Sequence, residues 1–123
     1  MTFRTLLMVI LAIVLVSCSP AFLTTPTETP VTTDIPADIP IYSEHFHVLV
    51  LNSSYAYQTS ADLETVSQFY QIEMVNQGWI QTQEPITYRN IAIVLHYKKD
   101  NKKAMIYMEY INDFTAISIV LGP

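Results

Sequence analysis

The sequence predicts an α+β fold, a two-layer sandwich in which one helix packs on an antiparallel sheet in the order β-β-α-β-β-β-β. Apolar residues recur at three- and four-residue steps over residues 62–77, as an amphipathic helix requires. The rest of residues 42–123 holds alternating apolar runs separated by short polar turns, which predict strands. Short turns join antiparallel neighbours, and one helix covers one face of a sheet, so the pattern favours two layers.

A β-hairpin is expected to open the domain. Residues His45–Leu51 and Tyr55–Thr59 are rich in β-forming side chains, and the Asn-Ser-Ser sequence of residues 52–54 has the composition of a turn. The two runs are therefore predicted to pair as neighbouring strands.

The helix is predicted over Asp62–Gln77. Asp62 is a good N-cap, because its carboxylate can accept hydrogen bonds from the free amides of the first turn. Gly78 stands where a glycine in the left-handed conformation would end the helix, and Trp79 is expected to fold back onto the core. The apolar face comprises Leu63, Val66, Phe69, Tyr70 and Met74.

Four further strands are predicted over Trp79–Gln83, Ile91–Lys98, Ala104–Ile111 and Thr115–Leu121, and Pro85 ends the first of them. The side chains expected to face the helix are Ile91, Ile93, Leu95, Tyr97, Ala104, Ile106, Met108, Tyr110, Ile117, Ile119 and Leu121. The second face carries His96, Lys98, Met105, Tyr107 and Glu109. One helix cannot cover both faces, so this second face is expected to be solvated or to bind a partner, with Tyr107 and Glu109 as binding candidates.

The first eighteen residues indicate export. Arg4 precedes an apolar run, Leu6–Val16, which is shorter than the roughly 20 residues that cross a bilayer as a helix. The run ends in the sequence Leu-Val-Ser-Cys at residues 15–18, which resembles the lipobox of bacterial lipoproteins. The resemblance implies that residues 1–17 are a signal peptide and that Cys18 receives a diacylglycerol. It also implies a lipid anchor in the cell membrane or outer membrane, with the domain outside the cytoplasm.

Residues 18–41 are predicted to hold the lipidated cysteine and a Thr/Pro-rich tether. Prolines recur through this segment, and they disfavour helix in a stretch with too little apolar content to fold alone. Asp38–Tyr42 is more apolar, and docking on the domain of residues 42–123 is an open possibility for it.

A pattern within the chain supports the same assignment. The chain enters the predicted domain with the sequence Ile-Pro-Ile-Tyr at residues 39–42. This sequence is followed by Thr59-Ser60, Val66, Phe69-Tyr70 and Gly78-Trp79. This arrangement resembles a helix and flanking strand of small α+β domains in bacterial envelope lipoproteins. The resemblance implies a fold and a location, and it transfers no catalytic residue.

Composition excludes several classes of function. The net charge is −5, and loss of Arg4 with the signal peptide leaves −6, so the basic surface of a nucleic-acid binder is missing. The two glycines, Gly78 and Gly122, stand too far apart for a phosphate-binding loop. No serine stands in a Gly-x-Ser-x-Gly elbow, and the single cysteine excludes an internal disulfide framework. Neither an enzyme nor a cofactor is therefore expected.

The histidines leave one alternative open. Residues two apart on a strand share a face, so His45 and His47 could present their imidazoles side by side, with His96 as a third metal ligand. The simpler interpretation is two histidines on a half-exposed strand. The favoured function is thus a non-enzymatic module that binds a protein, peptide or glycan through its open sheet face, and a small-ligand or metal sensor is the alternative.

Tyrosines are numerous, with eight in the chain. Tyrosine combines contact area with a polar group and is enriched at interfaces. Periodicity assigns Tyr70, Tyr97 and Tyr110 to the core. The remaining five are expected at the surface: Tyr42, Tyr55, Tyr57, Tyr88 and Tyr107.

Overall fold

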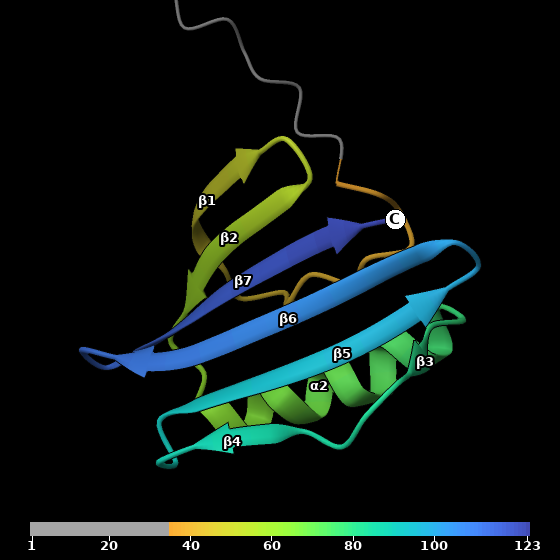
Figure 1. Cartoon of the computed structure of the whole chain (residues 1–123). Helices are drawn as coiled ribbons and strands as arrows, with labels where there is room; N and C mark the ends of the chain where they lie inside the picture. Colours follow the sequence, from red (N-terminus) through yellow and green to blue (C-terminus); the bar gives the residue numbers. More distant parts are fainter. Residues whose placement is uncertain (1–34) are drawn as a thin grey trace, which may run out of the picture. The chain divides into compact units, whose positions relative to one another are not determined.

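A computed structural model describes residues 35–123 (Figure 1). The predictions for the signal peptide, Cys18 and most of the tether fall on residues outside this described part. Within it, no helix has the length and apolar character needed to cross a bilayer.

Residues 35–123 form one helix and a seven-stranded antiparallel sheet, which confirms the α+β prediction. The strands are β1 (Phe46–Leu51), β2 (Ser54–Thr59), β3 (Ile80–Gln81), β4 (Ile86–Tyr88), β5 (Ala92–Lys99), β6 (Lys102–Ile111) and β7 (Phe114–Gly122), and the helix α2 (Leu63–Asn76) lies between β2 and β3. The sheet order is β1-β2-β7-β6-β5-β3, and β4 also pairs with β5. The opening hairpin therefore joins the sheet through β7, the last strand of the chain. In Figure 1, α2 lies behind the long strands and covers one face of the sheet.

The structure adds one short strand, β4, to the predicted order. Its three residues pair with the start of β5 across a turn in which Arg89 and Asn90 have positive φ angles of 47° and 58°. The turn has no glycine, so the usual sequence signature of a tight hairpin is missing. Pro85 was therefore predicted to end a strand, and the strand that follows it was not predicted.

The helix begins and ends as predicted. The Thr65 amide donates to Asp62 Oδ1 at 2.8 Å and the Thr65 hydroxyl donates to Oδ2 at 2.9 Å, and these hydrogen bonds, chiefly that from the amide, hold the pKa of Asp62 below its ordinary value. At the other end, Gly78 has a φ of 84°, a conformation that glycine adopts without strain. The chain then reverses, and the Trp79 amide donates to the Met74 carbonyl at 2.9 Å.

The core lies between α2 and the sheet. Its buried side chains include Val66, Tyr70, Met74, Trp79, Leu95, Tyr97, Ile106, Met108, Ile117 and Ile119. Two of the tyrosines expected at the surface, Tyr55 and Tyr57, are instead 5% and 2% exposed. Conversely, Tyr110 and Ile91 were expected in the core and are exposed, because they lie near the end of β6 and before β5. These four assignments from the sequence are wrong.

The segment before β1 is part of the packed domain. Ile39 is 4% exposed within the core, and the Trp79 indole Nε1 donates to the Asp38 carbonyl at 2.8 Å. Lys99 Nζ lies 3.0 Å from Asp38 Oδ2 and donates to the Gln77 carbonyl at 2.7 Å. The end of the predicted tether is therefore docked where α2 ends.

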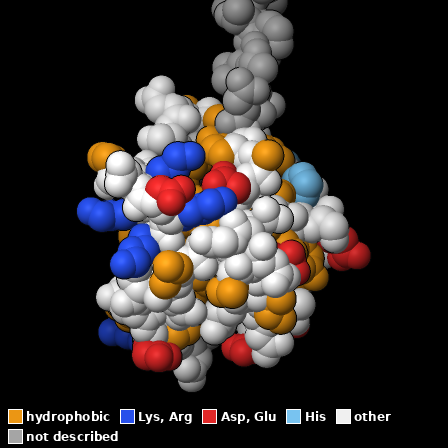
Figure 2. All heavy atoms as spheres, turned by 90° about the vertical axis from the view of Figure 1, so that its right-hand side faces the viewer, with side chains coloured by type: hydrophobic (Ala, Val, Ile, Leu, Met, Phe, Trp, Pro, Cys, Tyr) orange, Lys and Arg blue, Asp and Glu red, His pale blue; other side chains and the backbone are white. Residues whose placement is uncertain are grey.

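Basic side chains are concentrated at one place. Every lysine of the sequence lies in the β5–β6 hairpin, next to its turn. Figure 2 views this side of the molecule and shows basic side chains gathered there, with acidic side chains between some of them. The acidic net charge thus conceals a locally basic surface.

Candidate functional site: a hollow in the open face of the sheet

The sheet face opposite α2, here called the open face, carries the mixed set of side chains that the sequence predicted. Cross-strand pairing places Tyr107 between Val94 and Ser118, and Met105 between His96 and Val120. Partners in an antiparallel register share a face, so these side chains form continuous rows across β5, β6 and β7. Tyr107 and Glu109, the binding candidates of the sequence, both lie on this face.

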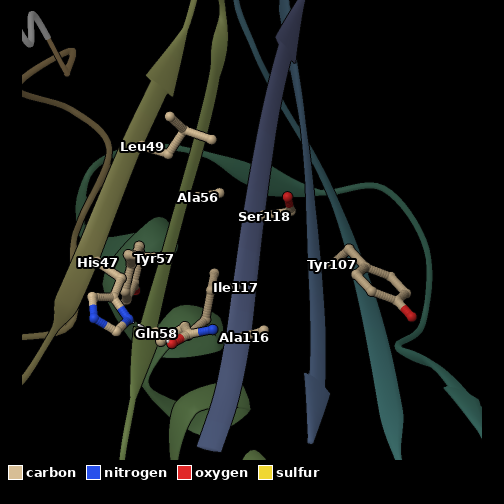
Figure 3. A pocket seen from close by; sticks show the side chains of 9 residues that line it. All are labelled: His47, Leu49, Ala56, Tyr57, Gln58, Tyr107, Ala116, Ile117 and Ser118. Carbon is tan, nitrogen blue, oxygen red and sulfur yellow. Dashed lines mark hydrogen bonds between the residues drawn. The ribbon is translucent and has the colours of Figure 1, made fainter. Parts of the chain in front are cut away.

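A hollow of about 260 Å³ opens in this face (Figure 3). Its floor is made by Ala56 on β2 and by Ala116 and Ser118 on β7, where small side chains leave the backbone uncovered. Leu49 stands on the β1 side and Tyr107 on the β6 side, so larger side chains flank the floor (Figure 3). The depression therefore follows from small residues on two central strands and larger ones on their neighbours.

A hydrogen bond sets the polar character of the β6 side. The Tyr107 hydroxyl donates to Glu109 Oε2 at 2.9 Å. This hydrogen bond, together with partial desolvation, raises the pKa of Tyr107 above its ordinary value. Tyr107 thus keeps its proton, and its ring is held beside the hollow. The hydrogen-bond partner of the Glu109 carboxylate is therefore the Tyr107 hydroxyl.

The opposite side of the hollow carries His47. His47 Nδ1 donates to Gln58 Oε1 at 3.0 Å, and the two side chains lie next to each other at the edge of the hollow (Figure 3). His47 has a φ of 54°, and the β1–β2 register shifts between Phe46 and Leu49. This bulge, which re-aims side chains at a sheet edge, explains why His47 reaches the open face.

His45 does not lie beside His47, so the structure does not show the arrangement of two adjacent imidazoles that was left open as an alternative. His45 precedes β1, its Nδ1 donates to the Tyr42 carbonyl at 2.6 Å, and its ring centroid lies 5.6 Å from that of Tyr57, a core residue. There it lines a separate cavity of about 440 Å³ with Ile41 and Val48. His96 lies elsewhere, in hydrogen-bond contact with Gln83.

The described residues contain no group of three or more His, Cys, Asp or Glu side chains placed to hold a metal ion. The three histidines contact different residues, and no observation on residues 35–123 favours the metal-sensing alternative.

The floor of the hollow was missed by the sequence analysis. A signal was present, because Ala56 and Gln58 alternate with large side chains on one strand, and Ala116 and Ser118 do so on another. Small residues on two strands leave a hollow in a sheet only when the two strands are neighbours. The pairing of β2 with β7, which lie at opposite ends of the domain in sequence, could not be predicted from the sequence.

The fold and the hollow together define a small α+β domain with a depression of about 260 Å³ on its open face. Comparison with known families agrees: the START domain-like family model matches residues 51–113, which is more than half of the chain. The chain therefore belongs to the START domain-like family. Family membership supports a ligand-binding module and is compatible with binding without catalysis. Neither the curated proteins nor the solved structures give a significant match.

Proposed function

We propose that this chain is a lipid-anchored module of the bacterial cell envelope that binds a partner on the open face without catalysing a reaction. The lipobox-like sequence ending at Cys18 supports the anchor, and the proline-rich segment after it supports a spacer. Family membership supports ligand binding. No cofactor enters the proposal.

The observation that carries the proposal is the hollow with its small-residue floor and mixed rim. The Tyr107 ring offers a flat apolar surface, and Ser118, Gln58 and Glu109 offer hydrogen-bonding groups around it. Such a combination suits a peptide side chain or a sugar ring, both of which need apolar contact and directed hydrogen bonds. The proposed partner is accordingly a protein, peptide or glycan on the outer side of the membrane.

Site-specific photocrosslinking in cells tests this binding function. A photoreactive amino acid at Ser118, in the floor of the hollow, is expected to give a discrete adduct. The matched control is the same amino acid at Gln68, which is exposed on α2. Digestion of the adduct by a protease or by a glycan-cleaving enzyme identifies its class. Equal crosslinking from Ser118 and Gln68 would show that the open face is not the binding surface.

The anchor has its own test. The wild-type chain is expected to be labelled by a fatty-acid analogue in bacteria, and Cys18→Ala should lose the label and remain uncleaved. Two acyl chains hold a protein firmly at a membrane, whereas one holds it only marginally, so wild-type chain should also remain with the membrane fraction after a salt wash. Labelling of Cys18→Ala, or none of the wild type, contradicts the lipoprotein proposal.

A further inference from the structure

The β5–β6 hairpin pairs like charges in a way that the fold alone does not require. Lys98 lies directly opposite Lys103, and Lys99 lies opposite Lys102. Like charges at directly opposed positions destabilise an antiparallel pair. The four lysines of this chain, whose net charge is −5, thus form two pairs of like charges that disfavour the hairpin. A ligand that neutralises them would account for the arrangement.

The two pairs lie on different faces and have different partners. Lys99 lies on the side of the sheet that faces the helix. There its Nζ donates hydrogen bonds to Asp38 Oδ2 at 3.0 Å and to the Gln77 carbonyl at 2.7 Å. Lys98 and Lys103 share the open face, and both are exposed. Within residues 35–123 the ion pair of Lys99 with Asp38 is the only one. Lys98 and Lys103 therefore carry two adjacent positive charges without a carboxylate partner among the described residues.

These two lysines border a cavity of about 520 Å³. Thr82, His96, Met105 and Val120 also line this cavity. Met105 and Val120 are cross-strand partners and are each 39% exposed, so they form an apolar surface beside the charges. The cavity thus has a cationic end and an apolar wall.

We propose that this cavity binds a small amphipathic molecule that bears a phosphate group, with the phosphate between Lys98 and Lys103 and the apolar part on Met105 and Val120. A phosphate monoester carries about −1.5 to −2 charges at neutral pH, which matches two ammonium groups better than a single carboxylate does. Lysine binds phosphate as a point charge, so the site demands little of the ligand's orientation. The Thr82 hydroxyl also lines the cavity, but it donates to the His96 carbonyl at 3.3 Å, so the two lysines carry the recognition of the phosphate.

This site is separate from the hollow of the proposed function. The hollow is lined by side chains of β1, β2 and β7 together with Tyr107. Lys98, Lys103, Met105 and Val120 do not line it. Failure of the phosphate site would leave the proposed binding function intact, and the reverse also holds.

Titration of the purified full chain in a non-ionic detergent tests the proposal. The soluble probes, added in the detergent, are inorganic phosphate and n-butyl phosphate, which is too short to form micelles. After removal of the detergent, the chain is compared on neutral vesicles with and without phosphatidylglycerol. Saturable binding of n-butyl phosphate, tighter than that of inorganic phosphate, is expected, with a change in the methyl NMR signal of Met105. Equal affinity for the two soluble probes would overturn the role of the apolar wall. A contact of Lys98 and Lys103 with the vesicle that depends on phosphatidylglycerol, without binding of n-butyl phosphate, would overturn the small-molecule assignment and indicate a membrane-surface contact.

Variants locate the binding. Lys98→Gln combined with Lys103→Gln is expected to weaken n-butyl phosphate binding by about tenfold or more, which is about 1.4 kcal/mol or more, because both charges that would face the phosphate are removed. Lys102→Gln is the matched control, because it removes a charge from the same hairpin on the other face. An equal loss in Lys102→Gln would show that only the general charge of the hairpin matters, and it would overturn the site. Thermal unfolding of all variants shows that each remains folded.

Discussion

Three tyrosines supply the polar contacts of the core. The hydroxyls of Tyr57 and Tyr70 hydrogen-bond each other, and the Tyr97 hydroxyl donates to the Tyr70 carbonyl at 3.3 Å. Burial raises the pKa of Tyr70 well above its ordinary value, and it raises that of Tyr97 to about 12. Among the described residues, no buried side-chain polar atom lacks a partner. The core therefore requires these phenols in their neutral form.

A pH dependence follows from the sign of these shifts. The unfolded chain ionises a tyrosine near its ordinary pKa of 10.0, whereas folded Tyr97 ionises at about 12. The folded state binds the proton more tightly, so the contribution is complete below pH 10 and is lost as the pH rises toward 12. Chemical denaturation between about pH 8 and about pH 12 should show a falling free energy of unfolding. Tyr97→Phe is the control, and a slope as steep as that of the wild type would contradict the argument.

The burial of two tyrosines, Tyr55 and Tyr57, was not predicted from the sequence. On β2, Tyr55 and Tyr57 alternate with Ala56 and Gln58, and the pattern shows two faces without showing which one meets the helix. Because a tyrosine hydroxyl needs a hydrogen-bond partner, Tyr55 and Tyr57 were predicted to lie at the surface. In the structure the Tyr57 hydroxyl is satisfied by Tyr70 and accepts a hydrogen bond from the Tyr42 amide at 3.2 Å, contacts between segments distant in sequence.

At the scale of elements, the join between α2 and β3 holds the two layers together. Trp79 is 2% exposed just beyond the helix, while Phe69 in the helix is only partly buried and contacts the Tyr42 ring at a centroid distance of 5.2 Å. The helix and the tryptophan were both expected from the sequence, but not their unequal burial.

Truncations should reflect this difference. Trp79→Ala is expected to lower the free energy of unfolding by about 3–5 kcal/mol, a large part of the total for a domain of this size. Phe69→Ala should cost less, because part of its ring is already in water. Ile72→Ala removes apolar atoms from a side chain that is 59% exposed on α2 and should be nearly neutral. Urea denaturation of the three variants checks the order, and a cost for Ile72→Ala equal to that of Trp79→Ala would refute this packing.

Elements differ in how far the sequence determines them. The long strands β5, β6 and β7 were predicted to within a few residues because many alternating side chains specify each one. β4 has three residues and a glycine-free turn, so local pattern could not reveal it. The bulge that turns His47 toward the hollow depends on pairing with β2, which is not encoded in β1 alone.

At the scale of the whole molecule, the packed domain begins earlier than its predicted first residue, Tyr42. The segment around Ile39 reads as the end of a proline-rich tether, yet it fills the core beside Trp79. Its ion pair joins Asp38 to Lys99, residues 61 positions apart. Composition reports the average behaviour of a stretch, whereas one buried isoleucine and one ion pair are enough to dock its last turn.

Two fragments test this docking. Residues 42–123 hold the helix and every strand, so this fragment is expected to fold, but it lacks Ile39 and Asp38 and should be less stable than residues 35–123. Loss of a buried isoleucine costs about 2–5 kcal/mol, and each kcal/mol shifts the Tm of a domain of this size by about 4–8 °C. Ile39→Ala in the longer fragment should reproduce most of the loss, and Asp38→Ala a smaller part, because the ion pair is partly exposed and surface pairs contribute about 0–1 kcal/mol. Calorimetry of the four proteins measures these differences. Equal melting of the two fragments would mean that the docked segment adds no stability and that the stable domain begins at Tyr42, the bound predicted from the sequence.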